Sequence, residues 1–278
     1  MKKSDRGTVI FCTIVLVLFS CLAVFPFLVS IVTSFKGSDE VYTIPFVWIP
    51  KALTLDNYYD AIIGHKFYVF MFNSIFVAST TTVFVIALAV IGGYGFSRHN
   101  FRGKSLLKLT ILSGYLVPVS VLFLPFFILM KNLGLLDNRW SLVLTYGAVS
   151  LPMALLMMTD YFAGIPIELD EAAYIDGSSK IGILIKIILP LASPGLVAVS
   201  LFCFILSWQD FLFAMIFINS PLKRTLALGL AQYRDYTGMI AWEMLMAAIV
   251  FAVLPTTVLF VVFQRWFVKG LTKGALKT

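Results

Sequence analysis

A short acidic segment lies between two long apolar stretches of the chain and ends on a glycine. Glu168, Asp170 and Glu171 follow Pro166, a residue that suits the first position of a helix. Carboxylates are favoured in a first helical turn because the helix dipole is positive there. Gly177 stands where a helix can end, because glycine adopts the left-handed backbone of a C-terminal cap without a side-chain penalty. The spacing predicts a short helix over residues 166–177.

One face of this helix would bring small and polar side chains together. Leu169, Ala172, Ala173 and Asp176 follow the i, i+3, i+4, i+7 spacing of a shared helical face. The two alanines would let another surface come close. From the spacing alone two interpretations stay open: a docking element for a partner protein, or an ordinary amphipathic helix at a membrane surface.

The patterns that common hydrolytic sites require are absent from the sequence. A phosphate-binding loop needs G-x-x-x-x-G-K-[ST], and at the nearest candidate, residues 103–105, Arg98 stands in place of the first glycine. His65 and His99 are the only histidines, and neither has metal-ligand spacing to a second ligand. We therefore expect no catalytic residue and no metal site in this chain, so that any ATP is hydrolysed by another polypeptide.

The composition places these residues in a membrane protein. Hydrophobic residues make up 60% of the chain and charged residues only 13%, which a soluble core of this size cannot accommodate. Cys12, Cys21 and Cys203 all lie in apolar runs, so we expect small buried hydrophobes and no disulfide framework. The net charge of +7 is then explained by membrane orientation and not by nucleic acid.

Six runs have the roughly 20 apolar residues that a membrane-crossing helix needs. The first follows a basic N-terminus but is too long for a cleaved signal, so it is expected to be an anchor. Asp210 interrupts the fifth run, and prolines at positions 26, 118, 125, 152 and 255 are expected to kink helices. The runs are 9–35, 67–97, 109–130, 140–159, 194–218 and 244–264.

The distribution of basic residues predicts the orientation of these spans. With both termini inside, 13 of the 21 Lys and Arg residues fall on the cytoplasmic side. Positive residues are enriched in cytoplasmic segments of membrane proteins. Both termini and the acidic helix are therefore expected in the cytoplasm.

The acidic segment also has a family resemblance. Residues 171–177, read as E-A-A-Y-I-D-G, and the downstream residues 188–191 and Pro194 resemble the E-A-A-x-x-D-G…L-P motif of ATP-binding-cassette (ABC) importer permeases. In that family the motif is the coupling helix, which docks into a separate ATPase. The resemblance implies coupling roles for Glu171, Ala172, Ala173, Asp176 and Gly177.

Several further segments resemble the carbohydrate-uptake branch of that family. Residues 264–277 are similar to its Q-R-x-F-V-x-G-L-T-x-G-A-V-K tail, and residues 207–212 to its W-N/Q-x-F pattern. Residues 225–230, and 246–248 followed by a proline at 255, extend the match. The resemblance covers the chain from about residue 68 to the end. Over this part the sequence is similar to the smaller permease subunit of the maltose system. The chain ends Lys-Thr where the family often has Lys-Gly.

The resemblance implies an all-α membrane protein of the type I ABC importer permease fold, with six transmembrane helices. Residues 1–66 would form an anchor helix and first outer loop, and residues 67–278 the permease core with a cytoplasmic tail. The implied partners are a second homologous permease, two ABC ATPases that bind ATP and Mg, an extracytoplasmic sugar-binding protein and membrane lipid, without nucleic acid. The implied location is a bacterial or archaeal cytoplasmic membrane.

Two groups of residues are candidates for contact with the transported solute or its carrier. The first group combines polar groups with an aromatic face, as a sugar site requires, and consists of Ser207, Trp208, Gln209 and Asp210. The alternative is that this polar group forms a structural hydrogen bond at the interface with the second permease. Hydroxyls at Ser150, Tyr115 and Tyr146 more often bond backbone or neighbouring helices. Residues 219–225 are named the outer loop. Contacts with the binding protein are predicted there at Asn219, Lys223 and Arg224, and the alternative is an ordinary polar turn.

The leading function is a sugar permease, with a di- or oligosaccharide as substrate. A glycerol phosphate ester is the alternative solute, although its phosphate calls for a basic residue along the path and the spans contain no Lys or Arg. A self-contained secondary transporter is the remaining alternative. Such carriers are expected to show intramembrane carboxylates and two similar halves, whereas Asp210 is the clearest intramembrane acid here and no repeat is visible.

Overall fold

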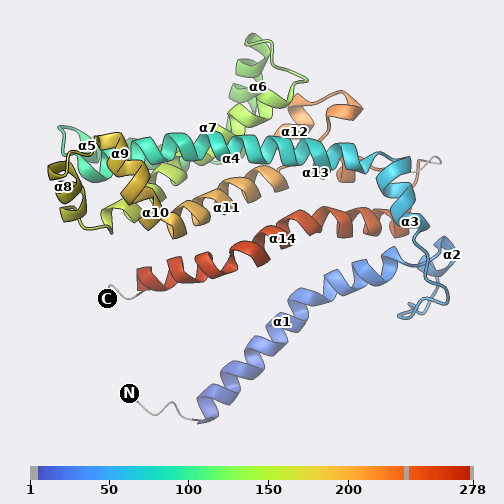
Figure 1. Cartoon of the computed structure of the whole chain (residues 1–278). Coiled ribbons are helices and arrows are strands. Elements are labelled where there is room, and N and C mark those ends of the chain that lie inside the picture. The colour runs from blue at the N-terminus through green and yellow to red at the C-terminus, as the bar shows by residue number, and fades with distance from the viewer. Residues whose placement is uncertain (1–5, 235–237, 276–278) are drawn as a thin grey trace. The chain divides into compact units, whose positions relative to one another are not determined.

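The computed structural model describes residues 6–234 and 238–275, with side chains described for 7–234 and 238–265. Throughout these residues the chain is helical and without strands. Four continuous helices are long and apolar enough to cross a membrane (Figure 1). They are α1 (Arg6–Ser34), α4 (Phe67–Arg98), α7 (Arg139–Ala163) and α14 (Trp242–Ala275).

Two bent helix pairs supply the remaining candidate spans. The first pair consists of α5 (Lys104–Tyr115) followed by η2 (Val119–Leu122) and α6 (Phe123–Asn132), with a bend of 87°. The second runs through α9 (Lys180–Ile183), η3 (Leu184–Ile188) and α10 (Leu189–Leu191) into α11 (Ser193–Gln209), with a bend of 81°. If each pair is one span, the described residues hold six, which confirms the predicted fold class.

The remaining helices are short and connect the spans. Two of them, α8 and η4, carry residues that the sequence had singled out. The short helices are α2 (Ser38–Val41), α3 (Asp56–Tyr59), η1 (Asp60–Gly64), α8 (Glu168–Ile175), α12 (Leu212–Phe217), η4 (Pro221–Lys223) and α13 (Leu226–Ala231).

Two spans expected to be continuous are broken, and each break has a local cause. The run 109–130 divides at Pro118, because proline has no N–H to donate and disfavours helical backbone at Val117 before it. The run 194–218 divides at Asp210, whose backbone is extended with φ −68° and ψ 131°. By contrast, the prolines at 26, 152 and 255 lie inside continuous helices.

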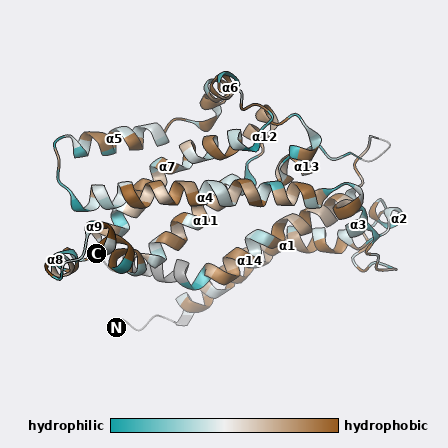
Figure 2. Cartoon of the chain, turned by 45° about the horizontal axis from the view of Figure 1, so that its top comes forward, coloured by the Kyte–Doolittle hydropathy of each residue, from teal (hydrophilic) through white to brown (hydrophobic). Residues whose placement is uncertain are grey.

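The contacts divide the chain into two compact units. One comprises Met1–Tyr68 and Leu230–Leu254, and the other Val69–Gly229 and Pro255–Thr278. The expected division into residues 1–66 and 67–278 stays a prediction. Within the first unit, the large apolar side chains of α1 between Val9 and Ile31 are mostly exposed, in keeping with the predicted anchor. Figure 2 colours each residue by its hydropathy.

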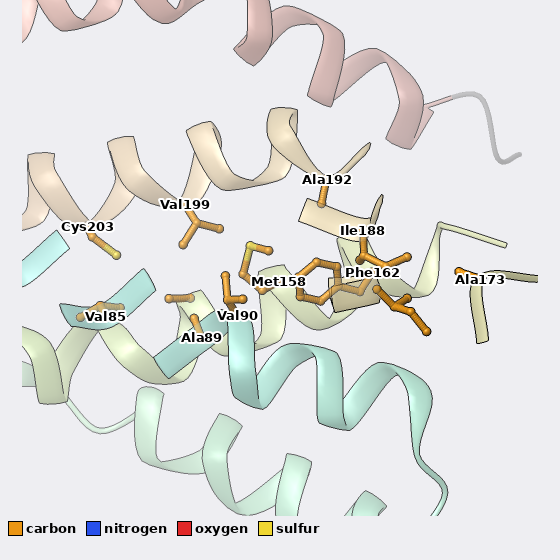
Figure 3. Close-up of a cluster of buried hydrophobic side chains, with 12 residues drawn as sticks. Val85, Ala89, Val90, Met158, Phe162, Ala173, Ile188, Ala192, Val199 and Cys203 are labelled. Atoms are coloured by element: carbon orange, nitrogen blue, oxygen red, sulfur yellow. The ribbon is translucent and has the colours of Figure 1, made fainter. Parts of the chain in front are cut away.

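The main core of the second unit lies between α4, α7 and α11. Val85 and Ala89 from α4 meet Met158 from α7, while Val199 and Cys203 come from α11 (Figure 3). Cys203 is fully buried there, as expected for a small hydrophobe, whereas Cys12 and Cys21 are exposed on α1. A Cβ added at Gly93 would lie 2.9 Å from the Cβ of Met158. Glycine therefore allows the close approach of α4 and α7.

A second core, rich in aromatic rings, holds α12 against α6 and α7. The ring of Phe213 lies with centroid distances of 4.9 Å to Phe123, 5.7 Å to Phe126 and 6.3 Å to Tyr146. Such tilted and edge-on aromatic contacts add to the burial of apolar area. This packing keeps α12 in place beyond the break at Asp210.

Candidate docking and translocation sites

The predicted acidic helix is present as α8, eight residues long, from Glu168 to Ile175. Its first turn is entered from Pro166 and Ile167, and the amide of Asp170 donates to the carbonyl of Ile167 at 2.9 Å. The three carboxylates of the first turn are Glu168, Asp170 and Glu171, as expected from the helix dipole. The structure thus places the start of the helix two residues after the proline.

Gly177 ends this helix in the left-handed conformation, with φ 84°. Its amide donates to the carbonyl of Tyr174, and the amide of Ser178 donates to Ala173, both at 3.0 Å. These two bonds form a Schellman cap, which satisfies the last carbonyls of the helix. A Cβ at Gly177 would meet nothing within 4 Å, so glycine is required here for its backbone conformation and not for space.

The exposed face of α8 differs from the predicted one. Ala173 is only 7% exposed and packs within its own chain near Phe162 and Ile188 (Figure 3). It is therefore unavailable to a partner here, and the prediction that both alanines share the approachable face is corrected. Ala172, Leu169 and Asp176 are exposed, as is Glu171. Beside them lie the bare side chains of Tyr174, 66% exposed, and Ile175, 84% exposed.

A buried ion pair ties α8 to the end of α4. The Nε of Arg98 lies 2.9 Å from Oδ2 of Asp170, and its Nη2 lies 3.2 Å from Oδ1. The hydroxyl of Tyr94 donates to the same carboxylate at 2.9 Å, and Arg98 Nη1 donates to the carbonyl of Phe162 at 3.1 Å. The sequence analysis did not single out Arg98 as a site residue. Its place at the end of a span, opposite an acid in a helical first turn, was the available signal.

Asp210 caps the short helix that follows it. Its Oδ2 accepts from the hydroxyl of Tyr146 at 2.7 Å and from the amides of Phe213 at 3.1 Å and Ala214 at 3.4 Å. A carboxylate in this position satisfies the free amides at the start of α12. These hydrogen bonds are structural and lie within the chain, while the alternative of a contact with a second permease stays a prediction.

The same carboxylate borders an open cavity of about 430 Å³. Gln209, Asp210 and Tyr146 supply its polar groups, and the remaining lining is apolar or backbone. Ser207 and Trp208 are directed elsewhere: the Ser207 hydroxyl donates to the carbonyl of Cys203 at 2.9 Å, and Trp208 stacks on Phe204 at 5.5 Å. The structure thus brings two of the four predicted pathway residues together with Tyr146.

The other hydroxyls considered for the pathway divide in the same way. Ser150 donates to the carbonyl of Tyr146 at 2.7 Å and is fully buried, as expected for a hydroxyl in a membrane helix. Tyr115 is 39% exposed at the end of α5. Only Tyr146 of these three lines the cavity that Gln209 and Asp210 border.

The outer loop is held by a residue that the sequence did not single out. Asp137 accepts from the amides of Asn219 at 3.0 Å and Ser220 at 2.8 Å, and its carboxylate lies 2.9 Å from Nζ of Lys223. Hydrogen bonds from Ser220, followed by Lys223, hold the pKa of the Asp137 carboxyl well below its usual range. Two of the predicted binding-protein contacts, at positions 219 and 223, are thus fixed by one carboxylate.

The far end of this loop is fastened to α4. The amide nitrogen of Asn73 donates to the carbonyls of Leu222 at 2.9 Å and Arg224 at 2.8 Å. Ser74 Oγ accepts from the amide of Leu226 at 2.8 Å. Nε of Arg224 is buried without a hydrogen-bond partner among the residues that the structure describes. Contact of this loop with a binding protein stays a prediction.

Two further predictions concern the cytoplasmic tail and metal binding. The side chains of the tail from residue 266 onward lie outside those that the structure describes. Among the described residues there is no group of three or more His, Cys, Asp or Glu side chains that could hold a metal ion.

Comparison with known proteins identifies relatives over most of the chain. Residues 86–273 match the model of the binding-protein-dependent transport system inner membrane component. The chain is 36% identical to the sulfoquinovosyl glycerol transport system permease protein SmoH of Agrobacterium fabrum, covering 91% of this chain and 88% of the relative. It is 34% identical to the trehalose/maltose transport system permease protein MalG of Thermococcus litoralis, covering 94% of each.

A solved structure shares the fold. A chain of a bacterial ABC transporter involved in import of the acidic polysaccharide alginate superposes with a TM-score of 0.82 at 25% identity, covering 96% of this chain and 99% of that one. A second chain, from an alginate ABC transporter in complex with a periplasmic protein bound to alginate pentasaccharide, has a TM-score of 0.68 at 10% identity. The latter likeness shows the fold alone.

Proposed function

Because this chain belongs to the family of binding-protein-dependent transport system inner membrane components, we propose that it is one permease subunit of an ATP-driven importer of di- or oligosaccharides. It is a transport component, and ATP hydrolysis belongs to a separate subunit. Relatives named for trehalose/maltose and for a sulfoquinovosyl glycerol support a sugar substrate. Neither the glycerol phosphate ester nor the secondary transporter is favoured by these relatives.

The observation that carries the proposal is the exposed short helix α8. It presents Glu171, Ala172, Tyr174 and Ile175 on its surface while its other side is fixed to the bundle through Asp170. An exposed apolar patch with a charged margin is typical of a protein interaction site. We assign this surface, with Asp176 and the turn at Gly177, to the ATPase that powers the importer.

The assembly proposed for this subunit has four kinds of partner. A second homologous permease completes the pathway, two ABC ATPases bind ATP and Mg, an extracytoplasmic binding protein delivers the sugar, and lipid surrounds the spans. The apolar exposed length of α1 supports contact with lipid or the second permease. In the cytoplasmic membrane, both termini and α8 would face the ATPases, and the loop 219–225 would face the binding protein.

The sugar would pass the cavity bordered by Gln209, Asp210 and Tyr146. Amide, carboxylate and phenol groups offer donors and acceptors for sugar hydroxyls, and apolar residues complete the lining. The described residues that line this cavity include no Lys or Arg to bind a phosphate group. This lining supports a sugar over the phosphate ester.

The proposal is tested by reconstituting this chain in proteoliposomes with the second permease, ATPase and binding protein encoded beside it. We expect ATP-dependent uptake of a labelled oligosaccharide that requires the binding protein. Glycerol 3-phosphate and maltose are compared side by side as probes of the two solute classes. Uptake without ATP or without the ATPase would contradict the proposal, as would uptake of the phosphate ester alone.

A further inference from the structure

The long helix α4 is fastened at both ends to the two segments that face different partners in the proposed importer. Near its start, Asn73 and Ser74 bind the backbone of the outer loop at residues 222–226. At its end, Tyr94 and Arg98 bind Asp170 of α8. Both attachments and the helix between them belong to the same compact unit.

The outer attachment is buried and made to backbone. Asn73 is 1% exposed and Ser74 2% exposed. One asparagine amide donates to two carbonyls of the loop, at Leu222 and Arg224. Because loop carbonyls and amides are the partners, movement of the loop backbone is passed to α4 directly and does not depend on a flexible side chain of the loop. Removal of the amide leaves two carbonyls without their donor.

The inner attachment is buried and charged. The side chains of Arg98 and Asp170 are 8% and 13% exposed. The guanidinium meets the carboxylate with two nitrogens, which fixes their relative orientation better than a single contact does. Its third contact, to the carbonyl of Phe162, brings in the last turn of α7. One arginine thus joins α4, α7 and α8.

Little else in α8 holds it to the bundle. Ala173 is its one buried residue, and its methyl group supplies a small contact. An eight-residue helix is too short to be stable by itself in water. Its position therefore depends on the Asp170 ion pair and on the capped turn at Gly177.

Between its two attachments α4 is an unbroken helix. It comprises 32 residues, from Phe67 to Arg98, without a proline. The 25 residue-to-residue steps from Asn73 to Arg98 correspond to about 38 Å at a rise of 1.5 Å per residue. Figure 1 shows α4 as one continuous ribbon with α8 beside its C-terminal end. Close packing on α7 at Gly93 limits bending in its inner half.

We propose that α4 is the strut that links the outer loop to the coupling helix, with Asn73 and Arg98 as the positioning residues at its ends. This inference rests on the proposed function. When a loaded binding protein displaces the loop, α4 moves with it, and Arg98 shifts α8 against the ATPase. Displacement of α8 by ATP binding travels the same path in reverse, since coupling between two sites is reciprocal.

The test is a double-mutant cycle in the fully assembled importer. Arg98→Ala, Asn73→Ala and the double variant are compared for basal ATPase rate, for stimulation of that rate by loaded binding protein, and for sugar imported per ATP. Each single variant is expected to lower stimulation roughly fivefold or more, within the range of ordinary allosteric coupling. Because Arg98 also holds the docking helix, all rates are expressed per co-purified ATPase, and the basal rate on that scale should persist.

The double variant decides whether the two residues act through one element. A strut released at one end transmits nothing further when its other end is released, so the double variant should be no worse than the more damaging single variant. Stimulation unchanged in the single variants would overturn the inference. Losses that multiply in the double variant would overturn it too, because they would indicate independent effects.

Milder variants keep the test decisive if an alanine variant fails to assemble. Tyr94→Phe and Ser74→Ala each remove one hydroxyl from an attachment and should lower stimulation partly. Arg98→Lys keeps the positive charge and should retain more stimulation than Arg98→Ala. No effect of either hydroxyl would count against the strut. Arg102→Ala and Ser79→Ala, exposed residues close to each end, are the matched controls and should behave as wild type. If the wild-type protein shows no stimulation or uptake, the proposed function fails. If the wild-type protein is stimulated and imports sugar but the variants do so equally well, only the strut inference fails.

Discussion

Single side chains hold the ends of the short helices in this protein. The carboxylate of Asp210 accepts hydrogen bonds from free amides at the start of α12. Gly177 supplies the left-handed turn that ends α8. Asp137, itself at φ 54°, gathers the amides of the outer loop. Each of these residues lies beside a segment assigned to substrate, ATPase or binding protein, so local backbone chemistry and proposed function coincide.

The turn at Gly177 gives the first prediction. Gly177→Val places a branched side chain at φ 84°, which costs on the order of 1–2 kcal/mol. We expect the variant to reach the membrane but to co-purify with less ATPase, and Glu171→Lys to do the same by reversing charge on the docking surface. Gly95→Ala is the matched control, because a Cβ there meets nothing within 4 Å in regular helix. Normal uptake and assembly in both test variants would refute the assignment.

The cap at Asp210 gives the second prediction. Asp210→Ala removes an N-cap, worth about 0.5–2 kcal/mol, and leaves the buried Tyr146 hydroxyl without its acceptor. We expect a lower thermal midpoint for the detergent-purified protein. Asp210→Asn, which keeps an acceptor oxygen, should lose less. Tyr146→Phe added to Asp210→Ala should recover part of the loss, since the unpaired hydroxyl is gone. Equal midpoints for Ala and wild type would contradict the cap.

At the scale of elements, the outer loop is held largely by polar contacts. Residues 219–225 are fixed by Asp137 on one side and by Asn73 on the other. Polar clasps of this kind hold a segment in one conformation yet release it when a partner supplies better contacts. These contacts hold the loop in one conformation within this chain.

The Asp137 clasp gives the third prediction, and it includes a pH dependence. Because the folded-state pKa is depressed, the clasp contributes stability above the unfolded value near 4 and loses it only as pH falls through the lower folded pKa. Amide exchange at Ser220 should thus be equally slow between pH 5 and pH 7 after correction for intrinsic rate. Asp137→Ala should speed it and lower binding-protein-stimulated hydrolysis.

The control for this loop is Lys131→Ala, which removes an exposed charge in the last turn of α6. It should leave both the exchange rate and the stimulation unchanged. Deleting residues from 219–225 should lower stimulation with basal hydrolysis and assembly intact. A shortened loop that keeps full stimulation would show that the segment is a connector only.

At the scale of the whole molecule, several long apolar helices have surfaces that no other part of the described chain covers. In α1 none of the most apolar window is buried, and in α14 only 17% of it is. Such surfaces require lipid or a partner subunit, because water cannot solvate them without a large free-energy penalty. The arrangement accords with a membrane subunit that completes its pathway with a second permease.

Topology is the fourth prediction and belongs to this scale. Single cysteines are introduced in a background lacking Cys12, Cys21 and Cys203, and are labelled with a membrane-impermeant maleimide in intact cells. Position 180 should label only after permeabilisation, and positions 51 and 139 should label from outside. Replacement of Cys203 by alanine is preferred because that thiol is fully buried. Labelling of position 180 from outside would show that the orientation is the reverse of the predicted one and that α8 does not lie on the ATPase side.

Several features followed from the sequence because they depend on local or additive physics. Apolar composition and run length determine that the helices cross a membrane, since each run must satisfy its own backbone in lipid. The start and end of α8 followed from Pro166, three carboxylates and Gly177, which act within one or two helical turns. These features needed no knowledge of which helix packs on which.

Other features were decided only by tertiary structure. The burial of Ala173, the place of Tyr146 beside Gln209 and Asp210 in one cavity, and the joining of Arg98 to Asp170 all depend on elements far apart in the chain. Asp137 meets residues more than 80 positions away, a distance over which spacing carries no signal. Periodicity shows which residues share a face, but only the packing of helices determines what that face meets.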